Sequence, residues 1–423
     1  MSFAGTASLT HEKAPALGLP FRYFAASLVF LALFSLLLPF NGDLFLGAFR
    51  TPGLLALVHI LTLGWITTTI LGAAFQLVPV ALQVGLYSER LPNVLLPIYL
   101  AGLVTLLIGL WQFQTAWIIA GASLLLLVGL GYLVLMAGTL ARVRHWDVVA
   151  AHVAASVCFA VLIPVLGLLL AINSHTGLLG LAYMASLKTH LLLALFGYVS
   201  LLILGVSYKL VGMFTLAEDL LPERLAWTEL ALVLAGLVGL TLAFYLPSWR
   251  WLGWLGGTAL LAGVGQFVYI LSVLYRKRRR RLFDINTPFT QTGAALFSLT
   301  LVAAGLGLAG WLPTPPTFWL AVGWLLILGW VGQIIVGQMY KITPFLTWLH
   351  RYADLVGLEQ VPGLDDLYNR RLALAGYGFW NAGVLVGTAA ILGGWAWLMT
   401  VAAVALSIGI WIFLLNMAFV ATR

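Results

Sequence analysis

Charged side chains are scarce in this 423-residue sequence. Asp, Glu, Lys and Arg make up only 8% of it, against about 25% in ordinary soluble proteins. Hydrophobic residues make up 62%, and the mean hydropathy is +1.06. The 21 basic and 13 acidic residues are too few to cover a water-exposed surface of this size. The composition therefore excludes a soluble globular protein and predicts a chain whose surface mostly faces lipid.

Cysteine is almost absent as well. The only one, Cys158, lies inside an apolar run, so the chain has neither an internal disulfide nor the thiolates of a zinc or iron–sulfur site. We find no phosphate-binding glycine loop and no Ser, His and Asp at an interpretable spacing. These absences argue against disulfide scaffolds, cysteine-ligated metal proteins and nucleotide-binding enzymes.

Long apolar runs account for most of the chain. A lipid core about 30 Å thick requires about 20 apolar residues per helix, and on this criterion we predict an all-helical membrane protein with twelve transmembrane helices. Residues 1–20 form an N-terminal tail without the apolar core of a cleavable signal peptide, so we expect the first span to act as the insertion signal. The predicted spans are 21–40, 54–80, 93–112, 116–140, 148–172, 181–212, 226–247, 251–275, 291–312, 317–340, 372–394 and 397–421.

Basic residues are unevenly distributed between the two sides that twelve spans define. The side with both termini receives 18 of the 21, and the other keeps only Arg50, Lys188 and Arg250. By the positive-inside rule we expect both termini to be cytoplasmic. We interpret the basic run 276–281 as an anchor for anionic lipid rather than a nucleic-acid patch. The bilayer is thus the expected partner.

One segment recurs three times, in the second, sixth and tenth spans. Each copy has a glycine followed by an aromatic residue, a second glycine eight residues on, and an aromatic three residues later. The first glycines are Gly64, Gly197 and Gly329, separated by 133 and 132 residues. Glycine is common in membrane helices, but unrelated similarity would not give two nearly equal intervals. We therefore predict an internal repeat of four spans.

The repeat divides the chain into three four-helix units, 21–145, 146–281 and 282–423, the last with a cytoplasmic loop at 345–371. Glycines at this spacing either let neighbouring helices approach closely or make room for a flat ligand. Both interpretations are open from the sequence.

Three of the seven histidines lie within predicted spans. A buried imidazole in lipid is costly unless it is hydrogen-bonded or ligated, so each is a functional candidate. His59 and His190 lie in the outer half, five and seven residues before the first glycine of their copies. His152 lies near the cytoplasmic end of its span, close to water, where a structural role is favoured. The remaining histidines, in the tail and loops, are His11, His145, His175 and His350.

This arrangement resembles the heme-copper oxidase subunit I-like superfamily, which includes the catalytic subunits of oxidases and nitric oxide reductases. The segment Leu328-Gly329-Trp330-Val331-Gly332 is especially similar to the family's tenth helix. The chain also resembles the NnrS family, twelve-span proteins that contain heme and copper and relate to nitric oxide stress. The resemblance implies that His59 is an axial ligand of a low-spin heme b, and it matches His190 loosely to a copper ligand.

The tenth span departs from the family pattern. The family's two histidines, seven and five residues before the Gly-Trp pair, fall here on Val322 and Trp324. Copper sites of this kind need several imidazoles, and no carboxylate stands at mid-membrane depth to relay protons. Oxygen reduction and proton pumping are therefore not expected. What stays feasible is a heme held by His59 or His190, or a metal bridged by both; copper is the weaker candidate.

The resemblance thus implies a heme-binding membrane protein that handles nitric oxide or transfers electrons and that lacks the full catalytic histidine set. It further implies the inner (plasma) membrane of a prokaryote, with other respiratory-chain subunits as candidate partners. Two alternatives stay open. One is a cofactor-free accessory or structural subunit of a respiratory complex, and the other is a transporter of a small solute or metal.

Overall fold

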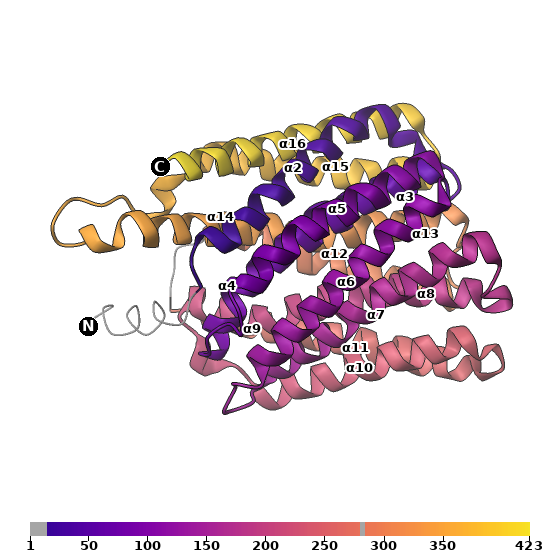
Figure 1. The fold of residues 1–423 in the computed structure, drawn as a ribbon, viewed down its shortest axis with the longest axis horizontal. Coiled ribbons are helices and arrows are strands. Elements are labelled where there is room, and N and C mark those ends of the chain that lie inside the picture. The colour runs from indigo at the N-terminus through magenta and orange to yellow at the C-terminus, as the bar shows by residue number, and fades with distance from the viewer. Residues whose placement is uncertain (1–14, 280–283) are drawn as a thin grey trace. The chain divides into compact units, whose positions relative to one another are not determined.

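The computed structural model describes residues 15–279 and 284–423, and within these ranges the fold is all-helical, with no strand (Figure 1). Twelve of its helices are long and apolar enough to cross a membrane, which confirms the predicted number of spans. The first 14 residues, with His11 and Lys13, and residues 280–283 lie outside the described part. The tail and the end of the basic run are therefore not tested.

Several spans consist of consecutive helical segments of different type. In chain order they are α2 with η1 (Gly18–Asn41, Gly42–Leu46), α3 with η2 and α4 (Pro52–His59, Ile60–Thr67, Thr68–Leu82), α5 (Arg90–Gln112), α6 (Thr115–Leu140), α7 (Val148–Thr176), η3 with α8, η4 and α9 (Gly180–Ala182, Tyr183–Leu192, Leu193–Ser200, Leu201–Thr215), α10 (Glu223–Tyr245), η6 with α11 (Pro247–Trp249, Arg250–Arg276), α12 (Asn286–Leu308), α13 with η7 and α14 (Pro316–Trp324, Leu325–Val331, Gly332–Arg351), α15 (Arg370–Gly393) and α16 (Ala396–Thr422).

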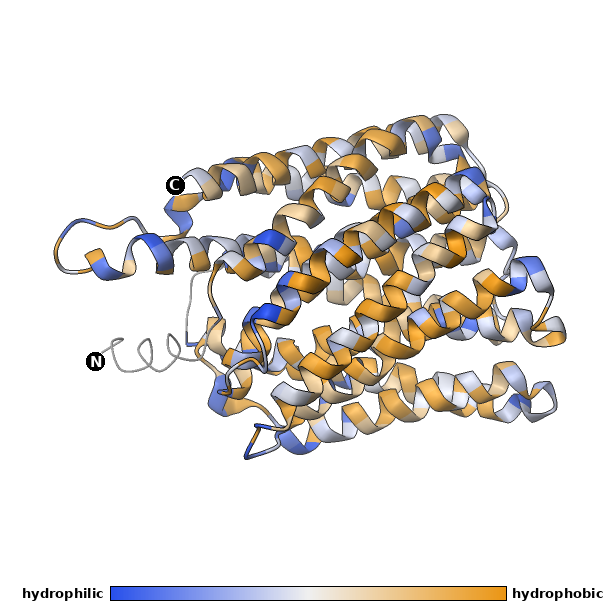
Figure 2. Ribbon diagram, viewed as in Figure 1, coloured by the Kyte–Doolittle hydropathy of each residue, from blue (hydrophilic) through white to orange (hydrophobic). Residues whose placement is uncertain are grey.

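Helix ends follow local sequence signals. The Asp147 side chain accepts a hydrogen bond from the Ala150 backbone N–H and so caps α7, whose other end stops at Gly177 with a left-handed backbone. Pro52 and Pro316 stand at the first turns of α3 and α13, where no backbone N–H is needed. Figure 2 shows hydrophobic residues along the helices and hydrophilic residues mainly at their ends and in loops. This is the pattern expected of helices that face lipid.

The tenth span is longer than we predicted. We expected it to end at residue 340 and a loop to cover 345–371, but α14 continues to Arg351 and the next helix begins at Arg370. Pro344 lies inside α14 rather than ending it. A helix in lipid tolerates proline where neighbouring groups satisfy the freed carbonyl, so the proline was not the stop signal that it would be in water.

The described residues form two compact units. One comprises 15–23 and 70–279, and contains the paired helices α5 and α6, the bundle of α7 with α8 and α9, and the hairpin of α10 and α11. The other comprises 24–69 and 284–423, and contains α12 packed on α14, and the hairpin of α15 and α16. Each unit is described separately below.

Three spans contain a π-helical segment, in which hydrogen bonds reach one residue further than in an α-helix. The segments begin at Ile60, Leu193 and Leu325, so successive starts are 133 and 132 residues apart. The first glycine of each sequence copy is the fifth residue of its segment. The π-helix is rare in proteins, and where it occurs it is often near a functional site. Its recurrence at the same position of the three sequence copies therefore marks these three spans for the search for a site.

Close helix packing in the hairpin of α10 and α11 depends on glycine, which permits a direct test. A Cβ on Gly256 would stand 2.7 Å from the Leu240 backbone nitrogen, whereas a Cβ on the adjacent Gly257 would meet nothing within 4 Å. We expect Gly256→Ala to destabilise the protein by about 1–3 kcal/mol through overpacking. Gly257→Ala should be neutral or slightly stabilising, because alanine favours helix. Thermal unfolding of the two variants in detergent measures the difference; equal midpoints would contradict this packing.

Candidate functional site

His59 is the last residue of α3, directly before the first π-helical segment. Its ring nitrogen Nδ1 lies 2.7 Å from the carbonyl oxygen of Leu55, four residues earlier. A carbonyl only accepts, so Nδ1 carries the proton and Nε2 presents its lone pair. Within the described residues Nε2 has no hydrogen-bond partner. This half-buried imidazole is therefore oriented in the manner of a metal-ligating histidine, whose other nitrogen donates to the protein.

His190 lies in α8, three residues before the second π-helical segment. Its Nδ1 lies 3.2 Å from the carbonyl oxygen of Ile163 in α7, so this ring is anchored to a neighbouring helix rather than to its own. A Cβ on Gly167 of α7 would stand 3.4 Å from the His190 ring, which places the imidazole directly against that helix. His190 belongs to the first unit and His59 to the second. A metal held by both stays a prediction.

The tenth span offers no imidazole at the corresponding depth. Trp324, five residues before Gly329, fills that position with a buried indole whose N–H donates to the Val384 carbonyl over 3.0 Å. Its ring also packs edge-to-face against Phe45. Trp324 is thus a satisfied core residue of its unit.

A side chain of a neighbouring helix packs against the first glycine of each repeat copy. A Cβ on Gly64 would stand 2.7 Å from Phe30 of α2, and one on Gly197 would stand 2.8 Å from Phe159 of α7. At Gly329 the nearest atom, 3.2 Å away, belongs to Leu296 of α12. Of the two interpretations left open by the sequence, the structure supports close helix packing at these three positions.

Clusters suited to a multi-ligand metal centre are absent from residues 15–279 and 284–423. No group of three or more His, Cys, Asp or Glu side chains is placed to hold an ion there. Three further histidines are exposed: His145 follows α6, His175 lies in the last turn of α7, and His350 lies in the last turn of α14 rather than in a loop as predicted. A site for heme or metal among the described residues would accordingly rest on one or two imidazoles.

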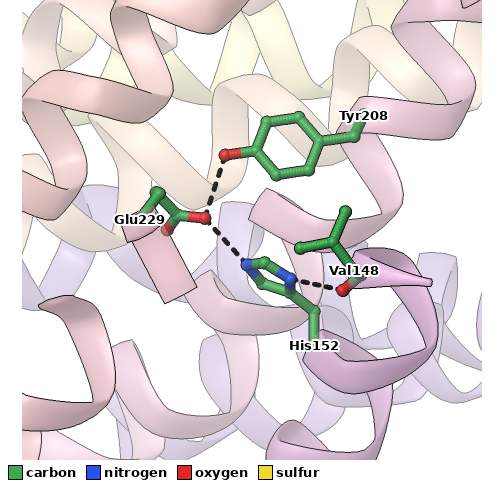
Figure 3. A network of polar contacts seen from close by, with 4 residues as sticks. All are labelled: Val148, His152, Tyr208 and Glu229. Atoms are coloured by element: carbon green, nitrogen blue, oxygen red, sulfur yellow. Dashed lines mark hydrogen bonds and ion pairs between the residues drawn. The ribbon is translucent and has the colours of Figure 1, made fainter. Parts of the chain in front are cut away.

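A buried polar network connects three helices of the first unit (Figure 3). His152 Nε2 in α7 lies 2.9 Å from Glu229 Oε2 in α10, and the Tyr208 hydroxyl in α9 donates to the same oxygen over 2.9 Å. His152 Nδ1 lies 2.7 Å from the Val148 carbonyl oxygen. The histidine and glutamate side chains are both 0% exposed. His152 is thus fully enclosed, although it lies near the end of its helix as the sequence indicated.

Glycine makes room for this network. A Cβ on Gly205 of α9 would stand only 2.2 Å from Cβ of His152, so any side chain at 205 would displace the imidazole. Gly205 is the second glycine of the repeat, and Tyr208 is the aromatic residue three positions later. Phe267 of α11 packs against the Tyr208 ring at 5.8 Å between centroids and closes the apolar surroundings. The repeat motif therefore builds part of the network.

The lysines that follow these aromatic residues are ion-paired. Lys209 Nζ lies 2.9 Å from Glu218 Oε2, and both side chains are partly exposed. Lys341 pairs with Asp284, and here both side chains are nearly buried. Each lysine thus has an acidic partner near a helix end.

Sequence reasoning missed Glu229 as a site residue. It was placed near the end of its span, but nothing in its neighbourhood along the chain indicated a partner, since His152 is 77 residues away. One signal was available. An acidic residue on a lipid-spanning helix is costly without a partner, and His152 was the in-span histidine predicted at the same end of its helix.

Breaking the network should be costly. In Glu229→Ala the His152 imidazole and the Tyr208 hydroxyl lose their shared partner while staying buried. Each buried polar group left without a partner costs about 1–3 kcal/mol, so the two together should cost about 2–6 kcal/mol. Tyr208→Phe removes one hydrogen bond and should cost only about 1–2 kcal/mol. Glu223→Ala, at an exposed position of the same helix, is the control and should leave the thermal midpoint unchanged. An equally small effect of all three substitutions would argue against the network.

Comparison with known proteins adds no relative. No protein-family model matches the chain, and no curated protein is significantly similar to it. The functional interpretation accordingly rests on the residues and their geometry.

Proposed function

We propose that this chain is a heme-binding membrane protein and that His59 is the axial ligand. The observation that carries the proposal is the orientation of the His59 ring. Its Nδ1 is held by the Leu55 carbonyl and its Nε2 has no hydrogen-bond partner among the described residues. A ring nitrogen without a hydrogen bond is costly on an apolar span unless something binds it. Histidine imidazole is a common axial ligand of heme iron.

The donor set fits a heme better than a copper centre. One neutral imidazole suffices to hold a heme iron, whereas a copper site of the oxidase type needs several imidazoles. His190, with its Nδ1 directed to the Ile163 carbonyl, is the alternative axial ligand. The heme would supply reversible electron transfer or binding of a diatomic gas such as nitric oxide. His59 would hold the iron and set its electronic character through the Leu55 hydrogen bond.

We propose further that the chain is a divergent member of the heme-copper oxidase subunit I-like superfamily, built of three four-helix repeats at 21–145, 146–281 and 282–423. The recurrence of a π-helical segment at intervals of 133 and 132 residues supports this division. So does the common packing of the first repeat glycines against α2, α7 and α12, the first span of each repeat. Trp324, in place of a family histidine, supports the loss of the oxygen-reducing centre.

The orientation proposed is that both termini face the cytoplasm. Its support is the distribution of basic residues, 18 of 21 on the side of the termini. On that side Arg142 donates to the carbonyls of Gly85 and Leu86 and ties two loops together. A protein of this type would lie in the plasma membrane of a prokaryote.

A reduced-minus-oxidised visible spectrum of the purified protein tests the heme. We expect a b-type spectrum with about one heme per chain, abolished or shifted in His59→Ala because the iron loses its axial ligand. His145→Ala, at an exposed position after α6, is the matched control and should keep the spectrum. Loss of the spectrum in His190→Ala and its retention in His59→Ala would instead assign the iron to His190.

A colourless preparation free of metal would refute the heme proposal. Solute flux in liposomes would then decide between a transporter and an accessory subunit, since only a transporter moves solute by itself.

Thiol labelling tests the orientation. In a Cys158→Ala background, His145→Cys and Ser248→Cys place single thiols at exposed positions after α6 and after α10. Residue 145 lies between the fourth and fifth spans, and residue 248 lies where the seventh and eighth spans meet. A segment after an even-numbered span is on the side of the termini, so we expect residue 145 inside and residue 248 outside. A membrane-impermeant maleimide added to intact cells should label Ser248→Cys at least ten-fold more than His145→Cys. The reverse ratio would invert the topology.

A further inference from the structure

We infer that His152, Glu229 and Tyr208 form an internal proton-binding site that exchanges its proton with water at one end of the spans. The ligand is a single proton shared between the imidazole and the carboxyl group. This site is separate from His59 and His190, and the inference does not depend on a bound heme.

The geometry fixes the number of protons. Nδ1 of His152 faces the Val148 carbonyl, which only accepts, so Nδ1 carries a hydrogen in every state of the ring. The Tyr208 hydroxyl uses its hydrogen toward Glu229 Oε2. Nε2 and Oε2 at 2.9 Å can then form a hydrogen bond only if one further proton lies between them. The network therefore binds one proton, and it loses this contact when that proton leaves.

The second carboxyl oxygen indicates where the proton resides. Glu229 Oε1 is buried and has no hydrogen-bond partner among the described residues. In the ion pair this oxygen would carry part of a negative charge with no donor, which is unfavourable in apolar surroundings. In the neutral pair Oε1 is an uncharged carbonyl oxygen and Oε2–H donates to Nε2. The orphaned oxygen thus favours a protonated Glu229 beside a neutral His152.

The network lies close to one end of all three helices. His152 is the fifth residue of α7, Glu229 the seventh of α10, and Tyr208 lies seven residues before the end of α9. They are thus four, six and seven residues from the helix ends, or about 6–11 Å at 1.5 Å per residue. A proton therefore has to pass about one to two helical turns between water and the carboxyl group.

Charged groups at that end make their contacts elsewhere. Each has a partner or is exposed: Asp147 caps α7, Lys209 pairs with Glu218, Asp219 pairs with Arg279, Arg142 binds loop carbonyls, and Glu223 and Arg224 are exposed in the first turn of α10. From α11 the network meets Phe267, which is apolar. Within the described residues no second charge lies against Glu229. When Glu229 gains or loses a proton, His152 is therefore the group that must take the opposite change.

Infrared spectroscopy of the full chain in lipid nanodiscs tests this directly. At neutral pH exposed carboxyl groups are ionised, because their ordinary pKa is about 4, so a carbonyl band of a protonated carboxylic acid reports a buried one. We expect such a band in the native protein, its complete loss in Glu229→Gln and its retention in Glu223→Gln. Transfer of the folded protein to D2O should shift the band as the acid proton exchanges.

Two results would overturn the inference. Absence of the band, or its survival in Glu229→Gln, would mean that Glu229 is not the protonated group. A band that keeps its position after long exposure to D2O would mean a sealed structural pair without exchange.

Incorporation of 13C-carboxyl glutamate into the native chain provides the same assignment without a substitution, because the band shifts only if it belongs to a glutamate. This measurement stands even where a variant fails to fold.

Discussion

Exclusion of water from the lipid core is the constraint on which this structure depends. A peptide group there finds no solvent to bind, so the chain satisfies its backbone within helices and places its turns at their ends. The same constraint acts on side chains. Lys341 lies against Asp284, Gln333 donates to Asn381, and Glu229 receives both His152 and Tyr208. Few polar groups lie within the spans, and these contacts show how such groups are held.

Because lipid thickness sets the length of an apolar run, the number of spans could be predicted from hydropathy alone, and all twelve are present among the described residues. Their ends were less predictable. We expected the tenth span to end at residue 340, yet α14 runs on to Arg351. The π-helical segments could not be predicted at all, because the same residues suit an α-helix and only the reach of the backbone hydrogen bonds differs. The repeat in sequence nevertheless marked their positions.

The candidate site could be predicted only in part. Hydropathy identifies the histidines that lie within spans, because an imidazole there stands out against its neighbours. Hydropathy does not identify partners that come from other helices. His152 and Glu229 are 77 residues apart, and their contact arises from the packing of α7, α9 and α10. The closest indication in the sequence was Gly205, whose missing side chain leaves the space that the His152 ring occupies.

His59 and His152 share one feature and differ in another, and the difference separates their proposed roles. Each ring donates from Nδ1 to the carbonyl four residues earlier, Leu55 or Val148, a contact that helix geometry offers to any histidine. What the fold decides is the partner of Nε2. At His152 the partner of Nε2 is the Glu229 carboxyl group, and the ring becomes part of the proposed proton-binding pair. At His59 no described residue is a partner of Nε2, so the same ring geometry leaves this nitrogen for the proposed heme iron.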